Sequence, residues 1–167
     1  MDRVDQRFEK IVQEYSEPLY WHIRRLVVSH EDAQDLLQDT LVTVYRKLWQ
    51  LRDPSKEKAW LFRCATNVVN HFFRRKKREL GDRTLDEYLE QTLRDSEYVN
   101  YTEAAGVRLQ KGLLTLTPQQ RTVFTLRYYD ELDYGEIARI TGSKPETLKV
   151  SYHNAKEKLK KVIEEDE

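Results

Sequence analysis

The amino-acid sequence predicts an all-α fold of two small helical domains joined by an acidic linker. Only five Gly and four Pro occur among 167 residues, so few positions interrupt a helix. Apolar side chains recur every three or four residues along nearly the whole chain, which is the spacing of one helix face. Residues 80–103 carry 2 Lys and Arg against 7 Asp and Glu, whereas both flanking segments are net positive. We therefore expect domains over 1–79 and 104–167, with 80–103 as the linker.

Three long amphipathic helices are expected to form one bundle in the first domain. The first spans about residues 5–26, where Pro18 predicts a kink or a break. The second spans about residues 29–51 and opens on a Ser-His-Glu-Asp cap. The third spans about residues 57–78 and ends in five consecutive cations, residues 74–78.

The acidic linker carries one signal of local structure. Thr84, followed three residues later by Glu87, is typical of a helix start. Three leucines at helical spacing follow it, Leu85, Leu89 and Leu93. We interpret 80–103 as a linker with a short helix of one or two turns.

Three helix starts of the same kind lie close together in the second domain. The pairs are Thr117 with Gln120, Asp133 with Glu136, and Ser143 with Glu146. Gly142 would end the middle helix, and Pro145 would lie in the first turn of the last one, where its missing N–H costs nothing. Two helices joined by a tight Gly-containing turn predict a helix-turn-helix, whose second helix can enter a DNA major groove.

The last helix carries a polar face that suits DNA. Leu148, Tyr152 and Ala155 belong to its apolar stripe, and the opposite face carries Glu146, Lys149, Val150, His153, Asn154 and Lys156. Lys contacts phosphate, while Asn, Lys and His can hydrogen-bond base edges. A solvated surface helix is the alternative, and the three successive helix starts favour the DNA-binding interpretation.

The third helix of the first domain mixes cations and amides with aromatic residues. The polar members are Arg63, Asn67, Asn70, His71, Arg74 and Arg75, and the aromatic ones are Trp60, Phe62, Phe72 and Phe73. Charge that follows the backbone and rings that take unstacked bases are what a single strand requires. The alternative is an aromatic core with a solvated basic tail, in which Trp60 and Phe72 would be buried.

A stripe on the second helix suggests a protein partner. It consists of Asp35, Gln38, Asp39, Val42, Arg46 and Trp49. Acids at the start and bases at the end of a helix suit its macrodipole, which explains the charges but not Val42 and Trp49 among them. Exposed apolar side chains of this kind predict a docking surface.

Catalytic and metal-binding functions find no support in the sequence. The four His are scattered, and the single cysteine, Cys64, lies on an apolar helix face, where an inert buried thiol is expected. No glycine-rich loop or nucleophile motif occurs, so we expect no enzyme, no cofactor and no metal. The lack of an apolar signal core or a membrane-length apolar run, with one cysteine, predicts a cytoplasmic protein without membrane insertion.

Three segments resemble bacterial sigma factors of the small extracytoplasmic-function (ECF) group, within the sigma-70 family. They are "DAQDLLQDTLVTVYRKLWQL", "AWLFRCATNVVNHFFRRKKRE" and "LTPQQRTVFTLRYYDELDYGEIARITGSKPETLK". Their order and separation match that group. The resemblance implies a sigma2-like three-helix bundle and a sigma4-like helix-turn-helix domain in a non-enzymatic subunit that gives RNA polymerase its promoter choice.

The resemblance also implies roles for the residues singled out above. The stripe from Asp35 to Trp49 would dock on the clamp helices of the largest subunit of core RNA polymerase, and the second domain on the flap. The −10 DNA would contact Lys56, Lys58, Arg63, Asn67, Asn70, His71, Arg74 and Arg75. The −35 DNA would contact Lys144, Glu146, Thr147, Lys149, Val150, His153, Asn154 and Lys156. An anti-sigma factor is a further partner that the family implies.

The sequence departs from the resemblance in the recognition segment, where Ser151 stands at a position that is often Arg in the family. The promoter sequence therefore cannot be inferred from relatives. The alternative function is an autonomous helix-turn-helix regulator of transcription, which would bind DNA without polymerase.

Overall fold

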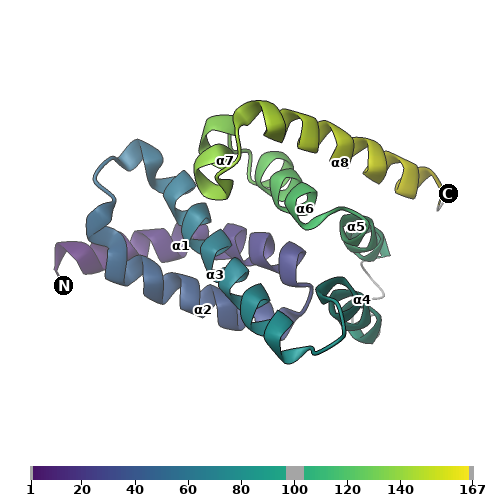
Figure 1. The fold of residues 1–167 in the computed structure, drawn as a ribbon. Helices are drawn as coiled ribbons and strands as arrows, with labels where there is room; N and C mark the ends of the chain where they lie inside the picture. The colour runs from purple at the N-terminus through teal and green to yellow at the C-terminus, as the bar shows by residue number, and fades with distance from the viewer. Residues whose placement is uncertain (1, 97–103, 166–167) are drawn as a thin grey trace. The chain divides into compact units, whose positions relative to one another are not determined.

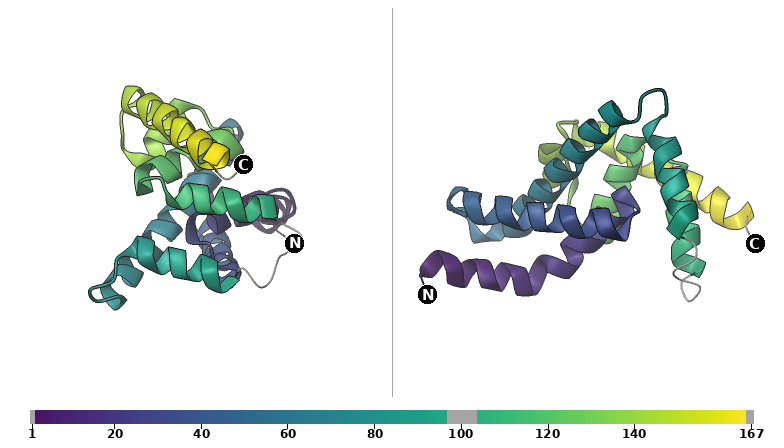
Figure 2. Two further views of the ribbon diagram at one scale, coloured as in Figure 1. Left: turned by 90° about the vertical axis from the view of Figure 1, so that its right-hand side faces the viewer. Right: turned by 90° about the horizontal axis from the view of Figure 1, so that it is seen from below.

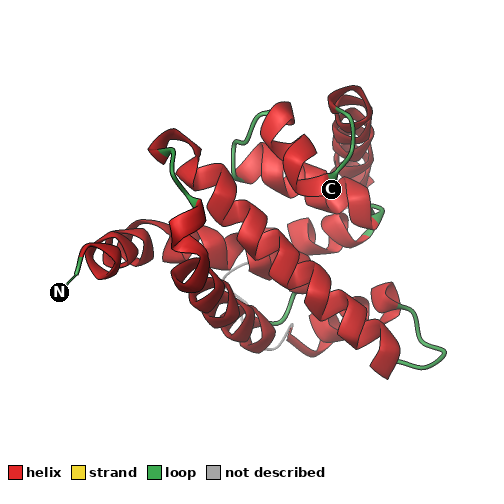
Figure 3. Cartoon of the chain, turned by 60° about the vertical axis from the view of Figure 1, so that its left-hand side comes forward, coloured by secondary structure: helices red, strands yellow, loops and turns green. Residues whose placement is uncertain are grey.

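The computed structural model describes residues 2–96 and 104–165 of the chain, and all regular structure in these ranges is helical (Figure 3). The all-α prediction is therefore confirmed. The chain divides into two compact units, Met1–Arg74 and Arg75–Glu167 (Figure 1). The functional boundaries that we expect at 79/80 and 103/104 stay a prediction.

The first unit consists of three long helices. Helices α1 (Arg3–Val27) and α2 (His30–Lys47) pack side by side, and α3 (Glu57–Glu79) follows them. Helix α1 continues through the exposed Pro18, so no break occurs there, and the helix is bent along its length (Figure 2). The core of this unit contains Ile11, Leu19, Ile23, Leu36, Val44, Leu61, Phe62, Ala65 and Val69.

The predicted second helix is too long at its C-terminal end. Helix α2 ends at Lys47, and Leu48–Gln50 form a 3-10 turn. A second short 3-10 turn, Pro54–Lys56, leads into α3. Trp49 therefore lies in the first of these turns and not on α2.

The second unit contains α4 (Leu85–Ser96), α5 (Ala104–Leu114), α6 (Pro118–Phe124), α7 (Tyr134–Thr141) and α8 (Pro145–Glu165). The predicted capping boxes at Thr117 and Asp133 are both present. The predicted cap at Ser143 is wrong, because α8 begins at Pro145 and Ser143 lies one position before the cap. Gly142 ends α7 with φ of 77°, in the left-handed region that glycine adopts without strain.

The acidic segment contains a longer helix than its composition suggests. Thr84 Oγ1 accepts a hydrogen bond from the Glu87 amide, at 3.1 Å, as predicted. Helix α4 then runs for 12 residues and packs on α5. Leu89 and Leu93 are buried. Apolar burial holds this helix to the second unit, because isolated helices of this length are marginal in water.

Candidate nucleic-acid and protein interfaces

The predicted −10 residues of α3 surround a hollow of about 590 Å³ in the first unit. Five of the eight line it, namely Arg63, Asn67, Asn70, His71 and Arg74, and all five are exposed. Trp60 and Cys64 also line the hollow. Trp60 and Phe72 are half-buried rather than core residues. Phe62 is the aromatic residue of α3 that is fully buried.

Three residues of the hollow were not singled out from the sequence. Thr43, Lys47 and Gln50 lie at the end of α2 and in the turn after it, and they face the α3 stripe across the hollow. They alternate with the predicted docking stripe along the chain, and their position follows only once α2 and α3 are placed together. They add one cation and one amide to the hollow.

The loop before α3 is held by a short side-chain turn. Asp53 Oδ1 accepts hydrogen bonds from the Ser55 amide at 3.0 Å and from its hydroxyl at 2.7 Å. These bonds from Ser55 lower the pKa of the Asp53 carboxyl. Lys56 is exposed in this loop and Lys58 is half-buried; neither lines the hollow, nor does the exposed Arg75 at the far end of the stripe.

A buried hydrogen bond joins α3 to α1 on the side of α3 that faces away from the exposed stripe. Thr66 donates its hydroxyl hydrogen to the Phe62 carbonyl at 2.8 Å, so its oxygen accepts from His22 Nε2 at 3.0 Å. His22 and Thr66 are both buried, and the His22 ring meets the Phe62 ring edge-on at 5.3 Å. The bond joins α1 to the residue next to Asn67, so it sets the rotation of the stripe. Sequence analysis gave His22 no role.

The predicted docking stripe is exposed at all six positions. Val42 is 48% exposed and Trp49 is 71% exposed, which are large values for apolar side chains. Five of the six lie on α2, whereas Trp49 lies on the following 3-10 turn. Tyr45 extends the apolar surface, because it is 45% exposed while its hydroxyl donates to Asp5 Oδ1 at 2.8 Å.

The eight predicted −35 residues are also all exposed, at the start of α8 and just before it. Leu148, Ala155 and Leu159 are buried on the opposite side of α8. Val150 is 60% exposed among the polar members. The Lys149 ammonium lies 5.9 Å from the centre of the Tyr134 ring, so α7 and α8 together shape this surface.

Polar contacts hold the helix-turn-helix in place. Gln119 Nε2 donates to Ser143 Oγ at 3.1 Å, which ties the turn to α6. The Glu136 amide donates to Asp133 Oδ1 at 2.8 Å, and this bond is the largest cause of the lowered pKa of the Asp133 carboxyl. Arg127 donates to the Leu132 carbonyl at 3.0 Å.

Arg121 of α6 is a charged residue inside the second unit, at 2% exposure. Its guanidinium donates to the carbonyls of Leu113 and Leu116, each at 3.0 Å, and to Asp86 Oδ1 at 3.3 Å. Burial lowers its pKa, while the Asp86 charge raises it. One side chain therefore joins α4, α5 and α6. The sequence signal was weak, because Arg121 sits within an ordinary capped helix.

Within the described residues, no group of His, Cys, Asp and Glu is arranged to hold a metal ion. Burial raises the pKa of the Cys64 thiol to about 11. None of the described helices combines the length and the apolar character that crossing a membrane requires.

Comparison with known proteins agrees with these features. The family model "Sigma-70 region 2" matches residues 11–79, and "Sigma-70, region 4" matches residues 106–159. RNA polymerase sigma-E factor of Streptomyces avermitilis is 31% identical over 94% of this chain and 85% of its own length. RNA polymerase sigma factor YlaC of Bacillus subtilis is 31% identical over 92% of this chain and 90% of its own length.

A solved structure shares the fold. The sigma factor RpoE of Bartonella quintana, solved in complex with the anti-sigma factor NepR, aligns with a TM-score of 0.77 at 24% identity, over 97% of this chain and 99% of that chain.

The chain belongs to the sigma-70 family, as a sigma factor of the ECF type with region 2 and region 4 domains. It is a non-enzymatic RNA polymerase sigma factor that directs promoter-specific transcription initiation.

Proposed function

We propose that this sigma factor divides its work among three exposed helix faces. The α2 stripe docks on the clamp helices of the largest polymerase subunit, and the second unit contacts the flap. The α3 hollow captures the melted −10 strand, and the start of α8 reads −35 duplex DNA. One observation carries the proposal: each of the three predicted stripes is exposed along a helix whose other side is buried.

The chemistry of the α3 hollow supports capture of unstacked bases. Its cations can follow a phosphate backbone, and Asn67, Asn70 and Gln50 offer amide donors and acceptors to base edges. Trp60 in its wall offers a ring for stacking. A concave site of this kind suits a base that has left the duplex.

The α8 surface supports duplex reading instead. Its exposed residues lie at the N-terminal end of the second helix of a helix-turn-helix, where side chains reach base edges in a major groove. Lys144, Lys149 and Lys156 supply phosphate contacts, and His153 and Asn154 supply base contacts.

Regulation by an anti-sigma factor is part of the proposal. Two proteins of the same fold, RpoE and CnrH, were solved with the anti-sigma factor NepR and with the cytosolic domain of CnrY. We propose a cytoplasmic location, where polymerase and promoter DNA are available.

A reconstitution experiment tests the proposed function. Core polymerase and the purified chain are incubated with genomic fragments, and run-off transcripts are mapped. We expect promoter-specific transcripts and promoter binding only when both proteins are present. Specific DNA binding by the chain alone, with no transcript in the presence of core, would support the autonomous regulator instead.

A further inference from the structure

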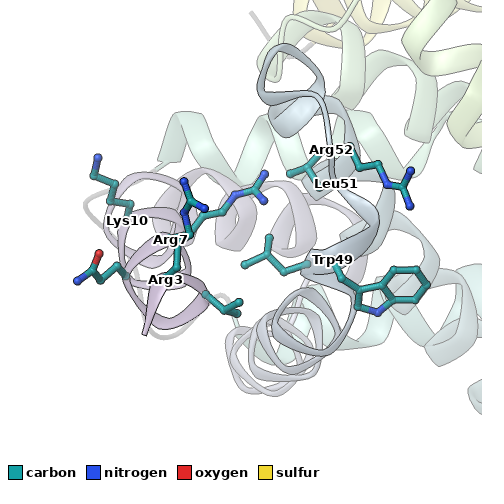
Figure 4. A pocket seen from close by; sticks show the side chains of 9 residues that line it. Arg3, Arg7, Lys10, Trp49, Leu51 and Arg52 are labelled. Carbon is teal, nitrogen blue, oxygen red and sulfur yellow. The ribbon is translucent and has the colours of Figure 1, made fainter. Parts of the chain in front are cut away.

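A second basic groove lies in the first unit, between the start of α1 and the turn that follows α2. Its volume is about 690 Å³. Arg3, Arg7 and Lys10 line it from α1, and Trp49 and Arg52 line it from the turn (Figure 4). No carboxylate is among the lining residues. None of the roles given above accounts for these four cations.

The cations of this groove repel one another without visible compensation. Arg3, Arg7 and Lys10 recur at helical spacing, and like charges at this spacing destabilise a helix. Among the described residues, the ion pairs and hydrogen bonds of the structure involve none of the four cations. Asp5, which lies between Arg3 and Arg7 in sequence, accepts from Tyr45 instead. A positive groove of this kind fits an anionic ligand.

The exposed indole of Trp49 indicates which class of anion the groove binds. Trp49 is 71% exposed, and Figure 4 shows it on the side of the groove opposite to the α1 cations. Guanidinium groups match phosphate in geometry, and an open aromatic ring offers a stacking surface to any base. Cations along a groove with one such ring are the combination that binds single-stranded nucleic acid.

The groove and the α3 hollow are both lined by residues of one short stretch of chain, residues 47–52. At the end of α2 and just after it, Lys47 and Gln50 line the hollow, whereas Trp49 and Arg52 line the groove. A strand that leaves the hollow over this stretch therefore stays among cations.

We propose that this groove binds the single-stranded DNA that extends from the α3 hollow toward the start site. Arg3, Arg7 and Arg52 contact its phosphates, and one base stacks on Trp49. The proposal rests on the proposed function, because it needs a melted strand in the hollow. It gives Trp49 a DNA-binding role in place of the predicted polymerase contact.

Fork-junction DNAs test the proposal on the reconstituted holoenzyme. Both DNAs carry a promoter identified by run-off transcription; the single-stranded tail either ends at the −10 element or extends by about eight nucleotides, within the span that one groove covers. The measured quantity is the ratio of the two dissociation constants, short tail over long tail. We expect a ratio of about ten for the wild type, since stacking of one base contributes on that order.

The variant Arg3→Gln/Arg7→Gln/Arg52→Gln should lower this ratio severalfold while leaving short-tail affinity unchanged. Its salt slope on the long tail should fall by about two, since each phosphate contact on a single strand contributes about 0.7. Trp49→Ala should lose most of the ratio and Trp49→Phe much less. 2-Aminopurine in the tail should be quenched by the wild type but not by Trp49→Ala.

A matched control removes three exposed cations from the second unit, Arg139→Gln/Lys160→Gln/Lys161→Gln. If the ratio of dissociation constants fell equally in this control, the loss of net charge alone would explain the result, and the proposal would be overturned. If the triple groove variant does not fold by circular dichroism, Arg3→Gln/Arg52→Gln replaces it, since both of these side chains are exposed.

The remaining outcomes separate this inference from the proposed function. If the groove variant lost affinity for core polymerase but kept the wild-type ratio of dissociation constants, the groove would bind an acidic segment of the polymerase. If neither quantity changed, the groove would be a solvated surface without a ligand. Either result overturns the inference while short-tail binding upholds the proposed function. Failure of the wild-type holoenzyme to bind the short-tail DNA would instead contradict the proposed function itself.

Discussion

Helices α3 and α8 carry similar residue types on their exposed sides but present them in different surroundings. The α3 stripe faces Thr43, Lys47 and Gln50 across a hollow with Trp60 in its wall. The eight predicted −35 residues begin just after the tight turn at Gly142, and all eight are exposed. Recognition chemistry is therefore set by shape as well as by composition: a hollow accepts bases out of the stack, and a helix end fits a groove.

The two units also differ in the polar groups that hold these helices. In the first unit, a buried hydrogen bond joins His22 to the Thr66 hydroxyl. In the second unit the corresponding group is a buried guanidinium, that of Arg121, which donates to Asp86 and to two carbonyls. A buried charge costs more to leave without partners than a neutral group does, so the second unit should be the more sensitive to loss of its polar contacts.

The largest effect is expected from the α2 stripe, which belongs to the first unit alone. Asp35 and Asp39 are one helical turn apart and exposed. Asp35→Lys/Asp39→Lys should weaken core binding at least about a hundredfold, because like charges against a complementary partner cost several kcal/mol. Co-elution with core polymerase measures the effect.

The matched control is Glu14→Lys/Glu17→Lys, which makes the same charge change on exposed residues of α1. It should bind core like the wild type. If the Asp35/Asp39 variant bound core polymerase with wild-type affinity, the α2 stripe would not be the docking surface.

The charged contact of the second unit is expected to give the next largest effect. Arg121→Met should destabilise that unit by about 3 kcal/mol, because the Leu113 and Leu116 carbonyls lose their donors. Asp86→Asn should cost about 1 kcal/mol or less, since the Asp86 side chain is 47% exposed and an amide oxygen still accepts.

Hydrogen exchange measured by mass spectrometry reports on each unit separately, which a single unfolding curve for a chain of two units does not. Protection should fall within 85–96 and 104–165 and stay unchanged in α1 and α2. His22→Leu provides the comparison for the first unit, where we expect about 1–2 kcal/mol because the Thr66 oxygen loses its donor. A larger loss from His22→Leu than from Arg121→Met would reverse the ranking of the two units.

A pair of single substitutions separates the two DNA surfaces. Asn67→Ala should slow promoter opening by about tenfold, the cost of losing one base contact, while closed complexes form normally. Lys149→Ala should weaken closed complexes and lower the salt slope by about one, because it removes one phosphate contact. Permanganate footprinting at saturating holoenzyme decides between the two roles, and equal loss of opening in both variants would erase the distinction.

Helix starts and exposed stripes could be predicted because they depend on local sequence. The caps at Thr117 and Asp133 satisfy amides within the same turn, and the stripes follow from the helical repeat. The predicted cap at Ser143 is wrong because Pro145 occupies the first position of α8. The residue directly before it, Lys144, is therefore at the cap position.

The hollow and the buried contacts could not be predicted, because they depend on how helices meet. Thr43, Lys47 and Gln50 line the hollow opposite the α3 stripe, which depends on how α2 packs against α3. Arg121 reaches Asp86, which lies 35 residues earlier in the chain. In α4 the high content of acids concealed the Leu89 and Leu93 face that is buried against α5.

The smallest effect of DNA binding, a few-fold change in alkylation rate, is expected at Cys64, which lies in the wall of the hollow. Cys64 is 8% exposed in the hollow wall, and burial raises its pKa from 9.0 to about 11. Because the thiolate is the reactive form, alkylation by iodoacetamide at pH 8 should be about a hundredfold slower in the native chain than in urea. The native rate should continue to rise with pH up to about 11.

The alkylation rate of Cys64 can also show which DNA covers the hollow. A melted −10 strand should slow its alkylation a few-fold further, because bases would lie over Trp60 and the thiol. Duplex −35 DNA bound through α8 should leave the rate unchanged. Mass spectrometry of the peptide that contains Cys64 measures both rates in the holoenzyme, where polymerase thiols do not interfere. Equal protection by the two DNAs would mean that the α3 hollow and the α8 surface are not used separately, which would contradict the division drawn from their shapes.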